Sequence, residues 1–137
     1  MASRYPTIWC GDHNLVTNPQ LDRVPPRCYN DSYAKDVKDL IEIFGMTDTC
    51  RLKYPNTKIF TFHRSGAKSR IDTILVSDNC DVKNYHQTDF SFTDHDLIEV
   101  NFQYKASWVP GRGFGKTTLQ FLVRSHLLMN SEYFGME

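Results

Sequence analysis

A short run at residues 70–77, RIDTILVS, restricts the possible folds more than any other part of the sequence. Its apolar side chains occupy both alternating positions, which is typical of a β-strand covered on both faces. Asp72 shares its parity with Ile74 and Val76, so the pattern places a carboxylate on an apolar face. A buried carboxylate needs a cation, a metal ion or several hydrogen-bond donors. The sequence therefore predicts that Asp72 has a cationic or hydrogen-bonding partner.

Two kinds of partner fit this requirement. Asp72 can form a structural ion pair with Arg70 or with another arginine. Alternatively, it can orient an imidazole, which fixes the tautomer of the ring and raises its basicity. His95, next to Asp94, is the candidate imidazole. Both interpretations predict a buried carboxylate, and only the second predicts a reactive centre.

The remaining pattern predicts a mixture of strands and one clear helix. Residues 94–104 alternate, with Ile98, Val100, Phe102 and Tyr104 on one face and Glu99, Asn101 and Gln103 on the other. Shorter strands are expected at residues 6–11 and 58–63, the second followed by a polar turn at 64–69. Residues 14–30 contain Pro19, Pro25 and Pro26, which indicates an irregular loop.

Residues 31–44 have the clearest helical period in the chain. Their apolar stripe consists of Tyr33, Val37, Leu40, Ile41 and Phe44. Asp31 or Ser32 is expected to cap the N-terminus, and Gly45 follows the C-terminal end. Residues 119–129 are a weaker helix candidate. The order of strand, loop, helix and three strands predicts an α+β fold in a single domain of 137 residues.

Composition excludes several classes of protein. Sixteen Lys and Arg residues balance sixteen Asp and Glu residues, so any contact with a polyanion must come from a local patch. The first residues lack the features of a secretory signal, and no apolar run reaches the ~20 residues that span a bilayer. The four cysteines, Cys10, Cys28, Cys50 and Cys80, form no CxxC pair. We therefore expect an intracellular protein with reduced thiols rather than a zinc site.

Three polar clusters lie at the ends of predicted strands: residues 11–14 (GDHN), 69–72 (SRID) and 93–95 (TDH). Loops at strand ends are where a rigid scaffold holds reactive groups. In the first cluster, Asp12 and Asn14 have two interpretations. They can form an Asx turn, or they can offer a carboxylate for proton transfer or metal binding and an amide that holds a substrate oxygen.

In this order, GDHN, SRID and TDHD resemble the three C-terminal motifs of the endonuclease/exonuclease/phosphatase superfamily. The intervening text is similar to the endonuclease domain of LINE-type (non-LTR) retrotransposons. GDHNLVTNPQLDR resembles the "GDFN…P.LDR" stretch of that domain, and DTCRLKYPNTKIFTF its "WR..HP….YTW" segment. GRGFGK and SHLLMNSEY are loosely similar to the linker that follows the domain. The resemblance runs continuously from about residue 8 to residue 104.

The resemblance implies a fold and an organisation. Residues 1–104 would be the C-terminal half of a four-layered αββα sandwich, and residues 105–137 a linker-like tail with a candidate helix. The half-domain that carries the family's metal-binding Glu is not matched, so Met1 would be an internal start and the catalytic set incomplete. A sheet without its partner layer would self-associate through its uncovered face.

The resemblance also implies roles for individual residues. Asp12 would activate or orient the attacking water or protonate the leaving oxygen, and Asn14 would hold the phosphate or the nucleophile. His95 would contact the phosphate, oriented by Asp72. Asp94 would help to hold Mg²⁺ or Mn²⁺, and Arg70 and Thr61 would support the site or the substrate. The implied activity is Mg²⁺-dependent cleavage of DNA in the nucleus.

Two other functions remain open. The chain can be a non-catalytic remnant of a retrotransposon, or a nucleic-acid-binding module without chemistry. Residues 62–70 contain basic and aromatic side chains that suit a nucleic-acid backbone, although a solvated hairpin loop has the same composition. Residues 111–118, GRGFGKTT, imitate a phosphate-binding P-loop, but Pro110 stands where that motif requires Gly.

Overall fold

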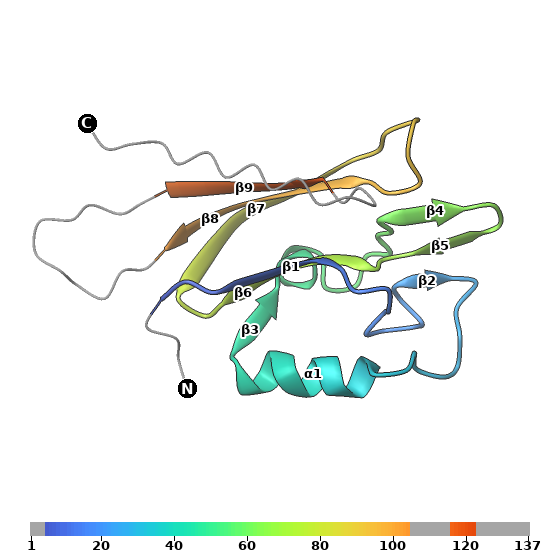
Figure 1. The fold of residues 1–137 in the computed structure, drawn as a ribbon, viewed down its shortest axis with the longest axis horizontal. Coiled ribbons are helices and arrows are strands. Elements are labelled where there is room, and N and C mark those ends of the chain that lie inside the picture. Colours follow the sequence, from blue (N-terminus) through green and yellow to red (C-terminus); the bar gives the residue numbers. More distant parts are fainter. Residues whose placement is uncertain (1–4, 105–115, 123–137) are drawn as a thin grey trace, which may run out of the picture.

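The computed structural model describes residues 5–104 and, for the backbone, residues 116–122. These residues form two helices and small antiparallel sheets, which confirms the α+β class (Figure 1). The helices are α1 (Ala34–Ile43) and α2 (Thr49–Lys53). The strands are β1 (Ile8–Asp12), β2 (Arg23–Val24), β3 (Met46–Asp48), β4 (Phe62–Arg64), β5 (Ala67–Ser69), β6 (Asp72–Ser77), β7 (Cys80–Thr88), β8 (Leu97–Tyr104) and β9 (Lys116–Leu122).

The strands pair in three sheets of three strands, in the orders β1-β6-β3, β2-β5-β4 and β7-β8-β9. β6 is the central strand of the first sheet, and its register places Asp12 opposite Asp72. β4 and β5 form a hairpin that leads directly into β6. The chain order therefore brings the ends of β1, β4 and β6 to one region of the molecule.

Both faces of β6 are covered, as its sequence predicts. Ile74 and Val76 belong to a core cluster with residues of β7 and β8, including Val82, Ile98 and Val100. On the opposite face, Thr73 and Leu75 line a small hollow together with Val37 and Ile41 of α1. Figure 1 shows α1 on one side of β6 and the β7-β8-β9 sheet on the other. Burial on both faces removes water from Asp72, which lies at the start of this strand.

Most of the predicted elements are present with shifted ends. The strand predicted at residues 94–104 is β8, and the burial of Ile98, Val100 and Phe102 confirms its inward face. The strand predicted at residues 58–63 begins only at Phe62, so it was placed too early. β3, α2 and β7 were not predicted, and neither were β2 and β5, which lie in the segments predicted as an irregular loop (14–30) and a polar turn (64–69). Short or bulged elements of this kind depend on tertiary contacts more than on a local period.

The helix predicted at residues 31–44 is α1, but its predicted cap is wrong. The N-cap residue is Tyr33, in the left-handed region at φ 63°, and no side chain caps the helix. Asp31 instead accepts the backbone N–H of Val16 at 2.8 Å and pairs with Arg23 at 2.5 Å. An arginine close in space therefore takes the carboxylate that the helix terminus would otherwise use.

The apolar stripe of α1 is only partly covered. Leu40 and Phe44 are 39% and 59% exposed, and the neighbouring Ile43 is 64% exposed. Glu99, Asn101 and Gln103 occupy the polar face of β8. Among the described residues, the exposed large apolar side chains lie on α1, on α2 and in loops, rather than on the polar face of β8.

The candidate helix at residues 119–129 is wrong for its first part. Residues 119–122 belong to β9, which pairs with β8, and the rest lies outside the described residues. The boundary between residues 104 and 105 stays a prediction. Of residues 111–118, which imitate a P-loop, residues 116–118 belong to β9 and the others lie outside the described residues. Neither α1 nor α2, the helices of the described ranges, is long and apolar enough to cross a membrane.

Candidate active site

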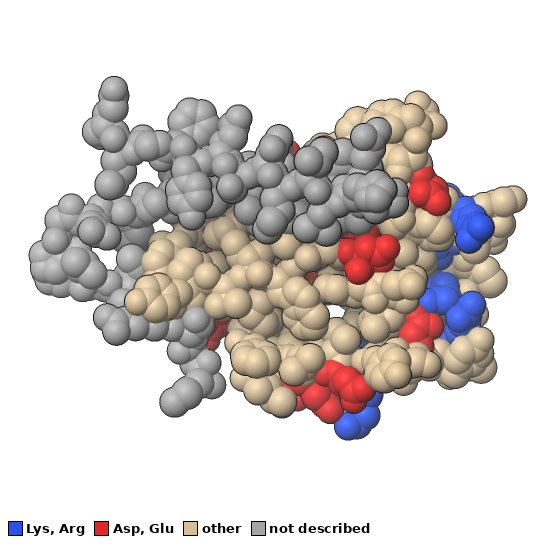
Figure 2. All heavy atoms as spheres, viewed as in Figure 1, with Lys and Arg blue, Asp and Glu red and all other residues tan. Residues whose placement is uncertain are grey.

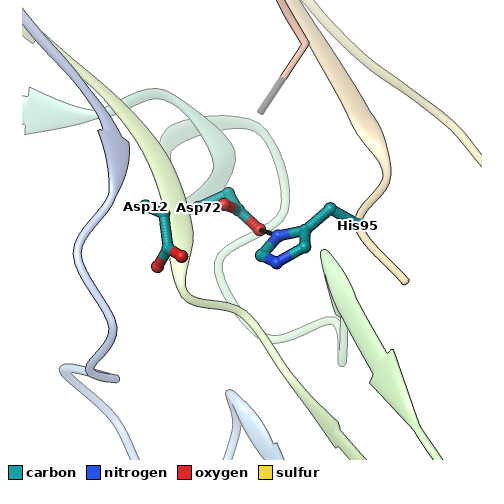
Figure 3. A group of neighbouring side chains, drawn as sticks. All are labelled: Asp12, Asp72 and His95. Atoms are coloured by element: carbon teal, nitrogen blue, oxygen red, sulfur yellow. Dashed lines mark hydrogen bonds and ion pairs between the residues drawn. The ribbon is translucent and has the colours of Figure 1, made fainter. Parts of the chain in front are cut away.

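The three predicted reactive groups, Asp12, Asp72 and His95, lie together (Figure 3). They come from the end of β1, the start of β6 and the segment just before β8. One carboxylate oxygen from each aspartate and one ring nitrogen of His95 all lie within 4.8 Å of one another. The antiparallel pairing of β1 with β6 accounts for the two carboxylates, because it sets Asp12 and Asp72 opposite each other.

The contact predicted between Asp72 and His95 is confirmed. Nδ1 of His95 lies 2.9 Å from Oδ2 of Asp72, and the Asp72 side chain is fully buried. An ionised carboxylate accepts a hydrogen bond from Nδ1–H, which fixes the tautomer and leaves Nε2 as the reactive nitrogen. The other carboxylate oxygen, Oδ1, is buried without a hydrogen-bond partner among the described residues. The alternative pairing of Asp72 with Arg70 is wrong.

Burial raises the pKa of Asp72 above its usual value. The Thr61 side chain and the His95 ring oppose this effect because they stabilise the ionised form, whereas the charge of Asp12 adds to it. The Thr61 hydroxyl also accepts the backbone N–H of Asp72 at 3.1 Å. Thr61 is fully buried, so it supports the site from inside the molecule.

His95 is held between β4 and β6. Its ring lies against that of Phe62, with ring centroids 4.9 Å apart, and residues 62 and 95 form an isolated β-bridge. The backbone N–H of His63 donates to the Asp94 carbonyl at 2.7 Å, and that of Asp96 donates to the Thr61 carbonyl at 2.8 Å. Backbone bonds on both sides of His95 therefore fix its position, and its side chain remains 16% exposed.

Asp12 and Asn14 form the Asx turn that their spacing allows. Oδ1 of Asp12 accepts the backbone N–H of Asn14 at 2.8 Å, and Asn14 adopts φ 51°, which Asn tolerates better than most residues. Both residues are exposed. The turn does not exclude a role for Asp12 in proton transfer or metal binding. Its carboxylate lies beside Asp72, and its second oxygen, Oδ2, is not used by the turn. The role of Asn14 stays a prediction.

Arg70 lies inside the protein rather than at a substrate surface. Its side chain is 1% exposed, Nε lies 2.8 Å from Asp22, and Nη2 lies 2.8 Å from Asp48. Burial alone would lower the pKa of Arg70, but the Asp48 and Asp22 carboxylates raise it. Direct contact with a substrate is therefore not available to Arg70 in this structure, whereas a support role is.

Asp94 lies beside the site but outside the cluster of ligand atoms. Its side chain is exposed, and the described group that can share a metal ion consists of Asp12, Asp72 and His95. Asp94 is therefore not part of this group, and its expected role as a metal ligand stays a prediction.

The sequence analysis missed a second histidine–carboxylate pair. Nε2 of His63 lies 3.0 Å from Oδ2 of Asp96, which also accepts the Gln87 side-chain amide at 2.5 Å. Asp96 is 3% exposed. Its parity matches that of Ile98 and Val100, so the argument used for Asp72 also predicts a buried carboxylate here. The pair braces the segment that carries His95.

His13 completes the surroundings of Asp12. Its ring lies 4.9 Å from that of Trp9, measured between centroids, and Nδ1 is 2.7 Å from the Thr73 hydroxyl. Burial lowers the pKa of His13 below its usual value. His13 therefore packs as a neutral ring against the β1-β6 pair and fixes the direction in which the chain leaves β1.

No protein-family model matches this chain, and no curated protein is significantly similar to it. The interpretation of the site therefore depends on its own geometry.

Proposed function

We propose that this chain carries the histidine–aspartate part of a phosphodiester-hydrolysing site that acts on DNA with a divalent cation. The convergence of Asp12, Asp72 and His95 supports the proposal, because these residues come from three separate segments and their ligand atoms lie within 4.8 Å. The proposed fold is the C-terminal half of a four-layered αββα sandwich, to which the β1-β6-β3 and β7-β8-β9 sheets would contribute.

Each of the three groups has a distinct role in the proposed reaction. Asp72 orients the His95 ring and stabilises its cationic form, so that Nε2 can donate a hydrogen bond to a phosphoryl oxygen. Asp12 is exposed and orients the attacking water through its carboxylate. Asn14, two residues further on, can donate from its amide to the substrate. This assignment uses the buried carboxylate for positioning and the exposed one for contact with water.

The donor set fits a hard divalent cation in part. Asp12 and Asp72 offer carboxylate oxygens, and the unpartnered Oδ1 of Asp72 is a buried acceptor that a cation would satisfy. Mg²⁺ binds through one or two carboxylates and keeps several waters, and Mn²⁺ also suits carboxylate and water ligands. A bound cation would supply Lewis-acid stabilisation of the phosphoryl oxygens.

Basic side chains near the site support nucleic acid as the substrate. Arg64 and Lys68 lie exposed on the β4–β5 hairpin, which continues directly from the segment that contacts Asp72 and His95. Figure 2 shows Lys and Arg side chains gathered at the end of the molecule formed by β2, β4 and β5. The chain has no net charge, so this local patch would provide the attraction to a phosphate backbone.

The test is nicking of a supercoiled plasmid by the full chain in Mg²⁺ or Mn²⁺. We expect only weak cation-dependent nicking by the wild-type chain alone, because the half-domain that would carry the metal-binding Glu is not matched and the described metal-binding group consists of Asp12, Asp72 and His95. His95→Ala and Asp12→Ala should reduce it to background, since general acid–base groups contribute about 10²–10⁴-fold. His86→Ala is the matched control, because His86 is exposed on β7.

Equal nicking by wild-type, His95→Ala and His86→Ala proteins would refute the proposal. Plasmid binding that weakens with added salt, without any nicking, would instead favour a nucleic-acid-binding module that performs no chemistry. Absence of both activities in a folded protein would favour a non-catalytic remnant of a retrotransposon. The same plasmid preparation can measure binding and nicking, which keeps the three outcomes distinct.

A further inference from the structure

A cavity of about 530 Å³ lies apart from the three proposed catalytic residues. Its wall consists of residues 17–22, 27, 28 and 30, together with Lys38 of α1, Arg51 of α2 and Pro55. Three of the wall residues, Arg27, Lys38 and Arg51, are cationic, and Asp22 is the acidic one. The charge that this wall presents therefore depends on how Asp22 is paired.

The charge of Asp22 is already neutralised inside the protein. Asp22 is fully buried and pairs with both Arg70 and Arg51. Arg70 also pairs with Asp48 at 2.8 Å. Two arginines and two aspartates thus form a closed group without net charge. Neither Asp22 nor Arg51 contributes an uncompensated charge to the cavity.

Arg27 and Lys38 are the cations that remain. Asp31 lies 2.5 Å from Arg23, whereas its distance to Arg27 is longer, at 3.7 Å. The charge of Asp31 is therefore mainly compensated by Arg23. Lys38 makes no ion pair within the described part of the chain, and Glu42, one helical turn further on, is not a wall residue. The wall therefore has an excess of two positive charges in a chain whose net charge is zero.

The neutral wall residues add hydrogen-bond donors to these charges. Oδ1 of Asn18 accepts the backbone N–H groups of Gln20 and Leu21, each at 3.2 Å. The Asn18 amide nitrogen has no hydrogen-bond partner among the described residues and can donate to a ligand. Thr17 and Asn30 also line the cavity. Hydroxyl and amide donors beside two cations are the groups that bind phosphate oxygens.

We propose that this cavity binds a phosphate group, carried either by a phosphorylated small molecule or by a nucleic-acid backbone. Arg27 and Lys38 supply the charge, and the amide of Asn18 supplies a directional contact. This site is independent of the proposed hydrolysis, because none of its wall residues belongs to the Asp12–Asp72–His95 cluster.

The experiment is an NMR titration of the isotopically labelled full chain with inorganic phosphate, with adenosine 5′-monophosphate and with a short single-stranded oligonucleotide. We expect phosphate-dependent shifts of the backbone amides of residues 17–21, except Pro19, which has no N–H, and no such shifts with adenosine. Saturation by the monophosphate alone identifies a small phosphorylated ligand. Saturation by the oligonucleotide as well identifies the nucleic-acid backbone.

Charge-removing variants test whether the cavity itself binds the phosphate. Arg27→Gln combined with Lys38→Gln should weaken phosphate binding about tenfold, the combined effect of two partly exposed ionic contacts. Lys53→Gln is the matched control, because it removes one exposed positive charge from α2 outside the cavity wall. No shifts at residues 17–21, or an equal loss in the control, would overturn the proposal. The dispersion of each variant's spectrum checks that it is folded.

Discussion

Replacement of Arg70 by Met should lower the free energy of unfolding far more than replacement of a surface arginine does. Met keeps much of the apolar volume of the side chain but removes three polar contacts. These are Nε to Asp22 at 2.8 Å, Nη2 to Asp22 at 3.2 Å and Nη2 to Asp48 at 2.8 Å. Because Asp22 is fully buried, the change leaves its negative charge in the interior without the positive charge of Arg70.

The magnitude follows from which contacts survive. Removal of one partner from a buried ion pair costs about 3–5 kcal/mol. Arg51 still contacts Asp22, and the Asp48 side chain is 17% exposed, so the lower end of this range applies. We therefore expect the free energy of unfolding to fall by about 3 kcal/mol. For a domain of this size that corresponds to a fall in Tm of about 10–15 °C.

Urea denaturation followed by circular dichroism, in wild-type and Arg70→Met proteins, measures this change. Arg64→Met is the matched control, because Arg64 is exposed on the β4–β5 hairpin and should change stability by no more than about 0.5 kcal/mol. A loss below about 1 kcal/mol in Arg70→Met would refute the buried-pair argument. Lost nicking at unchanged stability would return Arg70 to the substrate-binding role that the family resemblance allows.

Three further outcomes are expected. The raised pKa of Asp72 means that its contribution to stability is greatest below the pKa of the unfolded chain and is lost as the pH rises through the folded pKa. Asp72→Asn should therefore remove this loss, measured as a smaller decrease in the free energy of unfolding between acidic and neutral pH. Burial raises the pKa of Cys10 to about 11, so iodoacetamide at pH 8 should modify the exposed Cys28 first, as read by peptide mass spectrometry; equal rates would contradict the burial. Ile98→Ala should cost about 2–5 kcal/mol in thermal or urea unfolding, because Ile98 is fully buried. Phe44→Ser should cost less than about 0.5 kcal/mol, because Phe44 is exposed, and similar losses in the two variants would show that the core is misplaced.

The amino-acid sequence was sufficient to predict β8, α1 and the central contact of the site. Alternation at residues 94–104 predicted the buried face of β8, and the helical period at residues 31–44 predicted α1. The parity of Asp72 with two apolar residues predicted a buried carboxylate. These features are local or periodic, so they can be read from the order of side chains along one segment.

Tertiary structure decided which partner each charged group takes. The sequence allowed Asp72 to pair with Arg70, but the fold turns Arg70 towards Asp22 and Asp48 and leaves Asp72 to His95. Local capping rules likewise favoured Asp31 at the start of α1, whereas Arg23 lies close enough to pair with it. A charged group interacts most strongly with the opposite charge that is nearest in space and least exposed to water. That neighbour is set by how strands and loops pack, which no single segment of the sequence specifies.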